Sequence, residues 1–294
     1  MIWLIGNKGM LGYEVERLLK GHKLNYLASD KEVDVCDYEA LENYGQNRKI
    51  NWIINCSGYT QVDKAEEEKE MTFKINRDGV RNIVRLSLEK QAKLIHISTD
   101  YVFSGEKEGF LGYTEDDKPN PINTYGESKL AGEKEIIGGL KEYFIIRTAW
   151  LYGLKGNNFV YTILRLCKER EVIKVVDDQF GSPTCTLDLA EVILKIIKDN
   201  FSGYGIYHFT NEGVTNWYGF ARVIYEKAKS LNLLGVSRRV EIREIKTEDY
   251  PTAARRPRYS ILFKDKIKKE FNLKIRDWEE SLVDFLNILS RQIK

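Results

Sequence analysis

The sequence predicts an α/β protein with a doubly wound parallel sheet and a smaller C-terminal α/β domain. Short apolar runs alternate with amphipathic helical patterns through the first half of the chain, and a glycine-rich turn follows the first apolar run. Such alternation is typical of parallel sheets, because parallel strands need long crossover connections, usually helices. The pattern becomes less regular after Gly153, which predicts a second and smaller unit.

The expected elements follow this alternation in order along the chain. In the first half we expect strands near 2–5, 24–28, 51–56, 93–98 and 143–148 and helices near 10–20, 38–47, 66–90 and 124–138. In the second half we expect helices near 158–170, 186–198, 216–230 and 278–292 and a strand in GIYHFTN (205–211). We therefore predict one domain over 1–153 and a second mainly over 154–294, with segments of 182–210 rejoining the first sheet.

Composition excludes several classes of function. The 294 residues include 46 basic and 44 acidic side chains, and the two kinds are interspersed. The net charge of +2 gives no indication of a polyanionic partner, so nucleic acid is not expected to bind. No basic and apolar leader opens the chain, and no apolar stretch is long enough for a bilayer, which predicts a cytoplasmic protein without membrane contact. The four cysteines and three histidines are scattered, so we expect free thiols and no metal site.

A glycine-rich loop joins the first strand to the first helix. Gly6, Gly9 and Gly12 allow a tight turn, close approach of a pyrophosphate to backbone N–H groups, and close helix-strand packing. Their spacing is G-x-x-G-x-x-G, which departs from the usual G-x-G-x-x-G of Rossmann-like sheets. Asp30 follows the next apolar stretch, where a carboxylate can bind an adenosine ribose hydroxyl or lie free on a surface loop.

A tyrosine and a lysine stand four residues apart in the expected helix near 124–138. This spacing places Tyr125 and Lys129 on one face of a helix, where the cation can lower the pKa of the phenol. Such a phenol can protonate a carbonyl oxygen as a hydride arrives. A solvated Tyr–Lys couple on any helix has the same spacing. The preceding strand, however, ends on Ser98-Thr99-Asp100, at the edge where ligands bind in such sheets.

Together these motifs resemble the extended short-chain dehydrogenase/reductases, and a closer resemblance is to the dTDP-4-dehydrorhamnose reductases. The closer resemblance runs essentially from end to end of the chain. It is carried by eight stretches in the same order: GYTQVDKAE (58–66), STDYVFSG (98–105), NTYGESKLAGE (123–133), RTAWLYG (147–153), GNNFV (156–160), DQFGSPT (178–184), NWYGFA (216–221) and ARRPRYSIL (254–262).

The resemblance implies an NADPH- or NADH-dependent reductase that acts on a nucleotide sugar. The reaction would reduce the C4 ketone of dTDP-6-deoxy-L-lyxo-4-hexulose to dTDP-L-rhamnose, and the second domain would bind this substrate. Besides Gly6 and Gly12 of the loop, the implied cofactor contacts are Gly9, Met10, Leu11, Asp30, Asp34, Val35, Gly58, Tyr59, Thr60, Tyr125 and Lys129.

The implied catalytic residues are Thr99, Tyr125 and Lys129. Thr99 would hydrogen-bond the C4 carbonyl, Tyr125 would protonate the developing alkoxide, and Lys129 would hold the nicotinamide ribose and keep the phenol acidic. The implied substrate contacts are Thr99, Asp100 and Trp150.

Two of the substrate-side residues have a simpler interpretation as well. The indole of Trp150 suits a deoxysugar face but also a protein core. The guanidinium of Arg256, in ARRPRYS, suits a diphosphate but also a solvated basic loop.

Several alternatives stay open at this point. The chain could be another nucleotide-sugar 4-ketoreductase or epimerase; a dehydratase is disfavoured because Tyr101 stands where a glutamate would follow Asp100. It could instead be a non-catalytic regulatory subunit like that of methionine adenosyltransferase. Asp30 would repel the 2′-phosphate of NADPH, whereas Lys8 and Lys31 could offset that repulsion. Some family members form homodimers with Mg²⁺ between glutamates, and Glu14 lies in that region, but the sequence contains no ligand cluster that assigns a metal.

Overall fold

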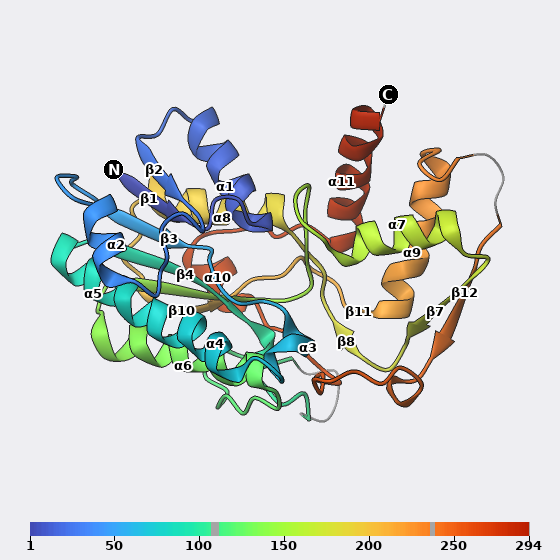
Figure 1. Cartoon of the computed structure of the whole chain (residues 1–294). Coiled ribbons are helices and arrows are strands. Elements are labelled where there is room, and N and C mark those ends of the chain that lie inside the picture. The colour runs from blue at the N-terminus through green and yellow to red at the C-terminus, as the bar shows by residue number, and fades with distance from the viewer. Residues whose placement is uncertain (107–111, 236–238, 294) are drawn as a thin grey trace.

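The computed structural model describes residues 1–106, 112–235 and 239–293. Its main feature is a six-stranded parallel sheet in the order β10-β5-β4-β3-β1-β2 (Figure 1). The strands are β1 (Ile2–Ile5), β2 (Tyr26–Ser29), β3 (Trp52–Asn55), β4 (Lys93–Thr99), β5 (Tyr143–Thr148) and β10 (Gly205–His208). The predicted doubly wound α/β fold is confirmed.

Helices cover both faces of this sheet, as Figure 1 shows. One face carries α1 (Met10–Gly21) and α8 (Thr186–Lys198), and the other carries α2 (Tyr38–Tyr44), α5 (Val80–Lys90) and α6 (Thr124–Gly139). Side chains alternate along the strands. Leu4 and Ile54 therefore enter the core under α1 and α8, and Ile5 and Ile53 enter the core under α2 and α5. Both faces are dry, which explains why these strands are continuous apolar runs.

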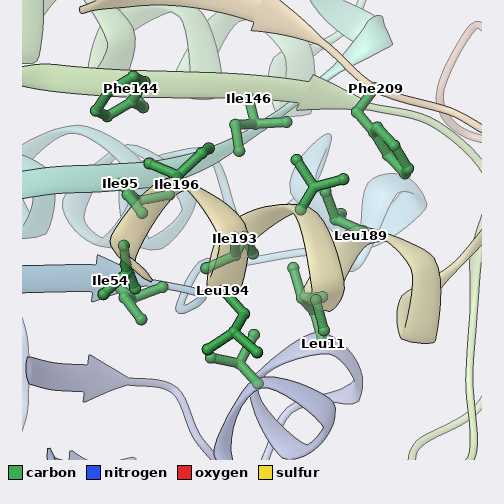
Figure 2. Close-up of a cluster of buried hydrophobic side chains, with 14 of the residues drawn as sticks. Leu11, Ile54, Ile95, Phe144, Ile146, Leu189, Ile193, Leu194, Ile196 and Phe209 are labelled. Atoms are coloured by element: carbon green, nitrogen blue, oxygen red, sulfur yellow. The ribbon is translucent and has the colours of Figure 1, made fainter. Parts of the chain in front are cut away.

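The core between the sheet, α1 and α8 is built mainly from aliphatic side chains, together with aromatic ones such as Phe144 and Phe209 (Figure 2). Leu189, Ile193 and Ile196 of α8 point at Ile146 and Ile95 of the strands. This packing, together with the pairing of β10 beside β5, places residues 186–208 on the main sheet.

The helix that was expected over 66–90 begins at Lys69 and continues to Lys90, but its middle part is π-helical. The structure has α3 (Val62–Ala65), α4 (Lys69–Phe73), a π-helical segment η1 (Lys74–Gly79) and then α5. A π segment adds a residue to a helical turn and is frequent at functional sites. Here it brings Asn76 to the loop after β3, where the Asn76 side chain bonds both backbone groups of Tyr59.

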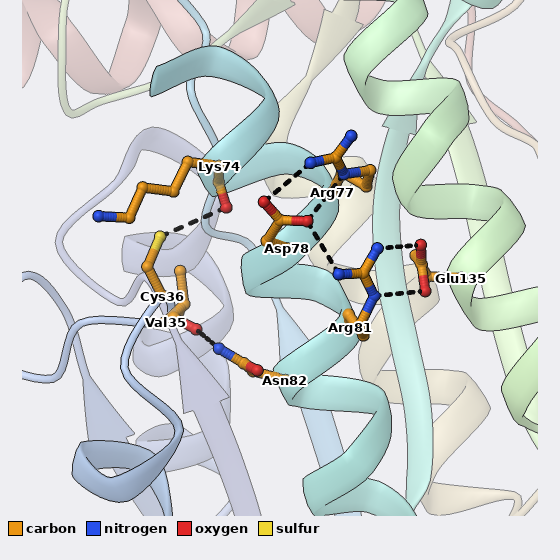
Figure 3. Close-up of polar contacts among 8 residues, drawn as sticks. All are labelled: Val35, Cys36, Lys74, Arg77, Asp78, Arg81, Asn82 and Glu135. Atoms are coloured by element: carbon orange, nitrogen blue, oxygen red, sulfur yellow. Dashed lines mark hydrogen bonds and ion pairs between the residues drawn. The ribbon is translucent and has the colours of Figure 1, made fainter. Parts of the chain in front are cut away.

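Polar contacts join η1 and α5 to two neighbouring parts of the chain (Figure 3). Asn82 Nδ2 donates to the Val35 carbonyl at 3.0 Å, which ties down the loop after β2. On the other side, Arg81 binds Glu135 of α6 through two N–H groups at 3.0 and 2.8 Å. The loop after β2 and the helix α6 are thus both held by hydrogen bonds to α5.

The rest of the chain forms a second core with α7 (Phe159–Glu169), α9 (Trp217–Ser230) and α11 (Trp278–Ile293). Its strands are β7 (Val172–Val176) and β12 (Glu241–Ile245), which pair in parallel. Short elements complete the structure: β6 (Leu151–Tyr152), β8 (Phe180–Gly181), β9 (Thr184–Cys185), β11 (Thr215–Asn216), α10 (Asp265–Glu270), and the 3-10 turns η2 (Asp100–Val102) and η3 (Thr247–Asp249). The domain boundary at 153 stays a prediction. Across the described ranges, no helix is both long and apolar enough to cross a membrane.

Candidate active site

A cleft of about 980 Å³ opens at the carboxyl ends of the parallel strands. The strand order reverses at β1, which has β2 on one side and β3 on the other, and ligands bind beside such a reversal. Of the predicted site residues, the cleft is lined by Gly6, Gly9, Met10, Leu11, Asp30, Asp34, Val35, Gly58, Thr60, Thr99, Asp100, Tyr125, Lys129 and Trp150. Gly12, Tyr59 and Arg256 are not among the lining residues.

The glycine loop lies at the N-terminus of α1 and leaves its backbone accessible. Gly6 has a φ of +82°, and a Cβ there would lie 2.8 Å from the Ser57 backbone nitrogen. Among the described residues, no side chain caps the helix at Gly9, and its first turn carries no acidic group. Free N–H groups and the positive end of the helix dipole therefore face the cleft, and this arrangement fits a pyrophosphate.

Gly12 and Tyr59 act from behind the cleft. A Cβ on Gly12 would lie 2.0 Å from the Gly6 carbonyl oxygen, so this glycine lets α1 pack against the loop. The backbone of Tyr59 is held by Asn76, whose Oδ1 accepts from the Tyr59 N–H at 2.8 Å. Asn76 also donates to the Ser128 hydroxyl at 2.9 Å, which links the loop after β3 to α6.

Helix α6 carries Tyr125 and Lys129 and is fixed at its first turn. The Asn123 side chain accepts from the Gly126 N–H at 2.8 Å and donates to the Arg255 carbonyl at 2.7 Å. The Glu66 carboxylate accepts from the N–H and the hydroxyl of Thr124 at 2.8 and 2.9 Å. An acidic group at a helix N-terminus is favourable because it complements the helix dipole.

The expected lowering of the Tyr125 pKa by Lys129 is not observed. Burial raises the pKa of Tyr125 to about 12, the hydrogen bond with Thr99 opposes this rise, and the Asp100 carboxylate adds to it. Lys129 instead donates to the Ile97 carbonyl at 2.7 Å, because the strand end lies within its reach. The phenol is therefore held protonated, which suits a proton donor more than a base.

Lys129 is buried, with 4% of its surface exposed. Burial lowers the pKa of Lys129 to about 8, and the Glu133 carboxylate raises it. Its amine lies 3.3 Å from the Nε2 atom of His96, a residue that the motifs did not single out. A Cβ on Gly58 would lie 3.7 Å from the same amine, so the amine faces the cleft floor.

Thr99 and Asp100 end β4 and are both buried. The Thr99 hydroxyl donates to Asp100 Oδ1 at 3.0 Å and accepts from the Tyr101 N–H at 3.2 Å. Burial raises the pKa of Asp100 to about 7, and its hydrogen bonds oppose this rise. Within the described ranges, Asp100 Oδ2 has no hydrogen-bond partner. A buried, unpartnered acceptor beside Thr99 is available to a polar ligand.

Trp150 lies between two other parts of the chain. Its ring stacks on Trp217 of α9 with centroids 3.6 Å apart and planes inclined by 11°. A Cβ on Gly181 would lie 2.8 Å from Trp150 Cε2, so the absence of a side chain there makes room for the indole. The φ of Trp150 is +48°, an uncommon value for a bulky residue and one associated with functional sites. Trp150 and Trp217 both line the cleft.

Arg256 is engaged by a carboxylate of the first half of the chain. Its Nη1 and Nη2 atoms donate to the two Asp63 oxygens at 3.0 and 2.7 Å. Arg256 is partly buried, with 22% of its side chain exposed. The pair ties the ARRPRYS segment to the helix after the third strand, and the expected diphosphate contact stays a prediction.

The end of the cleft beside the loop after β2 carries mixed charge. Asp30, Lys8 and Lys31 all line it. Lys8 forms an ion pair of 2.9 Å with Glu32, whose other oxygen accepts from the Asp30 N–H at 2.8 Å. Lys8 is therefore paired with a carboxylate at this end of the cleft.

Sequence reasoning missed Asn76, His96 and Trp217 at the site. Trp217 lies in the NWYGFA stretch, so its place in a shared motif was an available signal. Asn76 and His96 gave no signal, because each acts through a contact with a residue distant in the sequence.

The structure adds no metal ligand cluster to the site. Across the described ranges, no group of three or more His, Cys, Asp or Glu side chains is placed to hold an ion. Glu14 is buried in α1, and its Oε2 accepts from Arg17 at 2.8 Å.

Comparison with known proteins agrees with this geometry. A dTDP-4-dehydrorhamnose reductase of Escherichia coli (strain K12) is 38% identical over 297 residues, which cover 98% of this chain and 97% of the relative. A crystal structure of dTDP-4-dehydrorhamnose reductase from Bacillus anthracis in complex with NADP has a TM-score of 0.91 at 39% identity and covers 98% of both chains. The orthologue from Clostridium acetobutylicum has a TM-score of 0.90 at 37% identity, covering 98% of this chain and 99% of its own. The family model described as RmlD substrate binding domain matches residues 1–291, and the chain belongs to that family.

Proposed function

We propose that this protein is an NAD(P)H-dependent dTDP-4-dehydrorhamnose reductase. It would reduce the C4 ketone of dTDP-6-deoxy-L-lyxo-4-hexulose and form dTDP-L-rhamnose, the last step in making that sugar nucleotide. The observation that carries the proposal is the meeting of Thr99, Tyr125 and Lys129 in one cleft with the uncapped N-terminus of α1. End-to-end relatives that carry this name support it.

The cofactor side of the cleft would be formed by the glycine loop and the loops after β2 and β3. Backbone N–H groups around Gly9 would bind the pyrophosphate, and Asp30 would bind the adenosine ribose. Lys129 would hold the nicotinamide ribose through its amine. When bound, the reduced nicotinamide supplies the hydride.

The chain's own contribution to the chemistry would be proton delivery and charge stabilisation. Tyr125 stays protonated at neutral pH because burial raises its pKa to about 12, so it can donate its proton to the C4 oxygen as negative charge develops there. Thr99 would hydrogen-bond the same oxygen. Asp100 would accept from a sugar hydroxyl through its unpartnered Oδ2.

The sugar would lie against Trp150 at the end of the first predicted domain and against residues of the second. Trp150 and Trp217 form one stacked aromatic surface at the cleft, which suits the apolar face and methyl group of a deoxysugar. Arg256 would lie on the diphosphate side, held by Asp63. Residues 154–294 would then act mainly in substrate binding.

The test follows oxidation of NADPH, and separately of NADH, by the purified chain with dTDP-6-deoxy-L-lyxo-4-hexulose, with the product identified by chromatography. Turnover to dTDP-L-rhamnose that is lost in Tyr125→Phe supports both the reaction and the acid. Turnover only with other 4-keto sugars would move the assignment to another nucleotide-sugar ketoreductase or epimerase. Tight cofactor binding without any turnover would favour a regulatory subunit.

A further inference from the structure

A buried hydrogen-bonded chain runs behind the Lys129 amine. Asn55 ends β3 and His96 lies in β4, and the two residues are direct partners in the register of these strands. Asn55 Nδ2 lies 3.0 Å from His96 Nδ1, and His96 Nε2 lies 3.3 Å from Lys129 Nζ. Asn55 and His96 are 1% and 0% exposed, so water does not compete for these contacts.

The orientation of the Asn55 amide follows from a backbone group. The Ser57 N–H donates to Asn55 Oδ1 at 3.0 Å, and the Ser57 hydroxyl donates to the same oxygen at 2.6 Å. A backbone N–H can only donate, so the amide oxygen must face Ser57 and the amide NH₂ must face His96. His96 Nδ1 then has to accept, and the single proton of the neutral imidazole has to be on Nε2.

The Nε2–H group of His96 therefore points at the Lys129 amine. An ammonium has only donors to offer and meets this N–H unfavourably, whereas an uncharged amine can accept from it. The amine still donates to the Ile97 carbonyl at 2.7 Å. The other titratable groups that act on Lys129 are the Glu133 carboxylate and the Cys56 thiol, and both raise the pKa of Lys129 and so favour the charged amine.

We propose that Asn55 and His96 are positioning residues for Lys129: Asn55 sets the His96 tautomer, and the His96 N–H weakens the hold of Lys129 on its proton. Lys129 is then a group that changes charge near the working pH instead of a permanent cation. Burial also lowers the pKa of Lys129 to about 8, in the same direction. The role of Lys129 in binding the cofactor rests on the function proposed above, but the tautomer and the titration do not.

The first test reads the tautomer in the unaltered protein. The chain has only three histidines, so a ¹⁵N-histidine-labelled sample gives three ring patterns. His22 is exposed and its His22→Gln variant identifies its signals, which leaves His96 and His208. We expect one buried ring to remain neutral with its proton on Nε2 and to disappear in His96→Phe. A His96 signal with the proton on Nδ1, or a charged ring at neutral pH, overturns the proposal.

The second test changes the tautomer through Asn55→Asp, which has nearly the same shape. A carboxylate can only accept, so the His96 proton should move to Nδ1 and Nε2 should offer a lone pair to Lys129. The pH at which the ¹³Cε signal of Lys129 titrates should then rise by at least about one unit, a tenfold change in proton affinity, because the new tautomer and the added negative charge both favour the ammonium. Lys129→Met assigns the signal.

A purely structural role would not move a pH profile, so the dissociation constant of NADPH is measured against pH by fluorescence. In Asn55→Asp its pH dependence should shift in step with Lys129, and in the His22→Gln control it should not. If the His96 proton moves to Nδ1 in Asn55→Asp but the pH at which Lys129 titrates does not change, the proposed coupling between His96 and Lys129 is refuted. The tautomer measurement needs no variant of Asn55, so it decides the His96 tautomer even if Asn55→Asp does not fold, and a His96 proton on Nδ1 would already overturn the proposal. Failure of sugar turnover would refute the proposed function and leave these readings intact.

Discussion

The buried carboxylate of Asp100 should make the protein less stable as the pH rises. Its pKa is raised by burial from 3.8 to about 7, so the folded chain binds a proton more tightly than the unfolded chain does. The burial of the Asp100 carboxyl therefore costs no stability below about pH 4, where the group is protonated in both states. The free energy of unfolding falls as the pH rises from about 4 to about 7, and above that range the loss is constant. Asp100→Asn removes this titration while keeping the size and most contacts of the side chain.

The magnitude follows from the two pKa values. The difference between 3.8 and about 7 is roughly three units, and each unit corresponds to about 1.4 kcal/mol, so the full cost is about 4 kcal/mol above neutral pH. Asp100 is 2% exposed, so solvent does little to reduce this figure. The difference in free energy of unfolding between Asp100→Asn and the unaltered chain should therefore increase by about 4 kcal/mol, in favour of the variant, as the pH rises from about 4 to about 8.

The assay is urea unfolding monitored by circular dichroism at a series of pH values. Asp116→Asn serves as the control, because it makes the same chemical change at a carboxylate that is exposed. The difference between Asp100→Asn and the unaltered chain should change with pH, whereas the control should follow the unaltered chain. Parallel curves for all three proteins would refute the argument, since they would mean that Asp100 does not hold its proton in the fold. The stabilised variant should also bind the nucleotide sugar less well, which is a usual cost of relieving strain at an active site.

Three further outcomes follow from the site. Tyr125→Phe should lower kcat, measured by stopped flow, at least about 100-fold, and should change the dissociation constant of NADPH, measured by fluorescence, less than about threefold. Undiminished turnover would show that Tyr125 is not the acid. Glu32→Gln should release Lys8 and raise the affinity for NADPH relative to NADH by up to about fivefold in fluorescence titrations, because solvent weakens an exposed ion pair. An unchanged ratio would show that Lys8 does not reach the 2′-phosphate. Trp217→Phe should raise the KM of the nucleotide sugar several-fold and lower kcat less, because Trp150 would pack more loosely. A larger effect on kcat than on KM in steady-state kinetics would contradict a role of Trp217 in substrate binding.

Much of the main sheet could be predicted from sequence because its strands are buried on both faces. Such strands are runs of apolar residues, and their ends fall at polar motifs such as Ser98-Thr99-Asp100. The strand β12 could not be found in this way, because its EIREI sequence has mostly exposed side chains. The π-helical segment Lys74–Gly79 could not be found either, because it is continuous with the α-helical turns of α4 before it and of α5 after it.

The same distinction applies to the site. Tyr125 and Lys129 belong to one helix, so their spacing alone brings them together. The pairing of His96 with Asn55 depends on which strands are neighbours, and the stacking of Trp150 on Trp217 depends on how the second core packs. The pKa of Tyr125 was expected to fall because sequence shows the nearby cation but not the burial that outweighs it.

The helix α6, which carries Tyr125 and Lys129, is held to the sheet by polar contacts that themselves depend on the fold. Glu133 is one turn beyond Lys129 on α6, and it binds Arg147 of β5 at 2.9 and 2.7 Å with both side chains at most 2% exposed. Ser98 of β4 donates to the same carboxylate at 2.5 Å. A buried ion pair contributes little net stability, because desolvation offsets much of its attraction, but it permits few geometries. The buried Glu133–Arg147 pair therefore accounts for the position of Tyr125 and Lys129 over the strand ends better than it accounts for the stability of the fold.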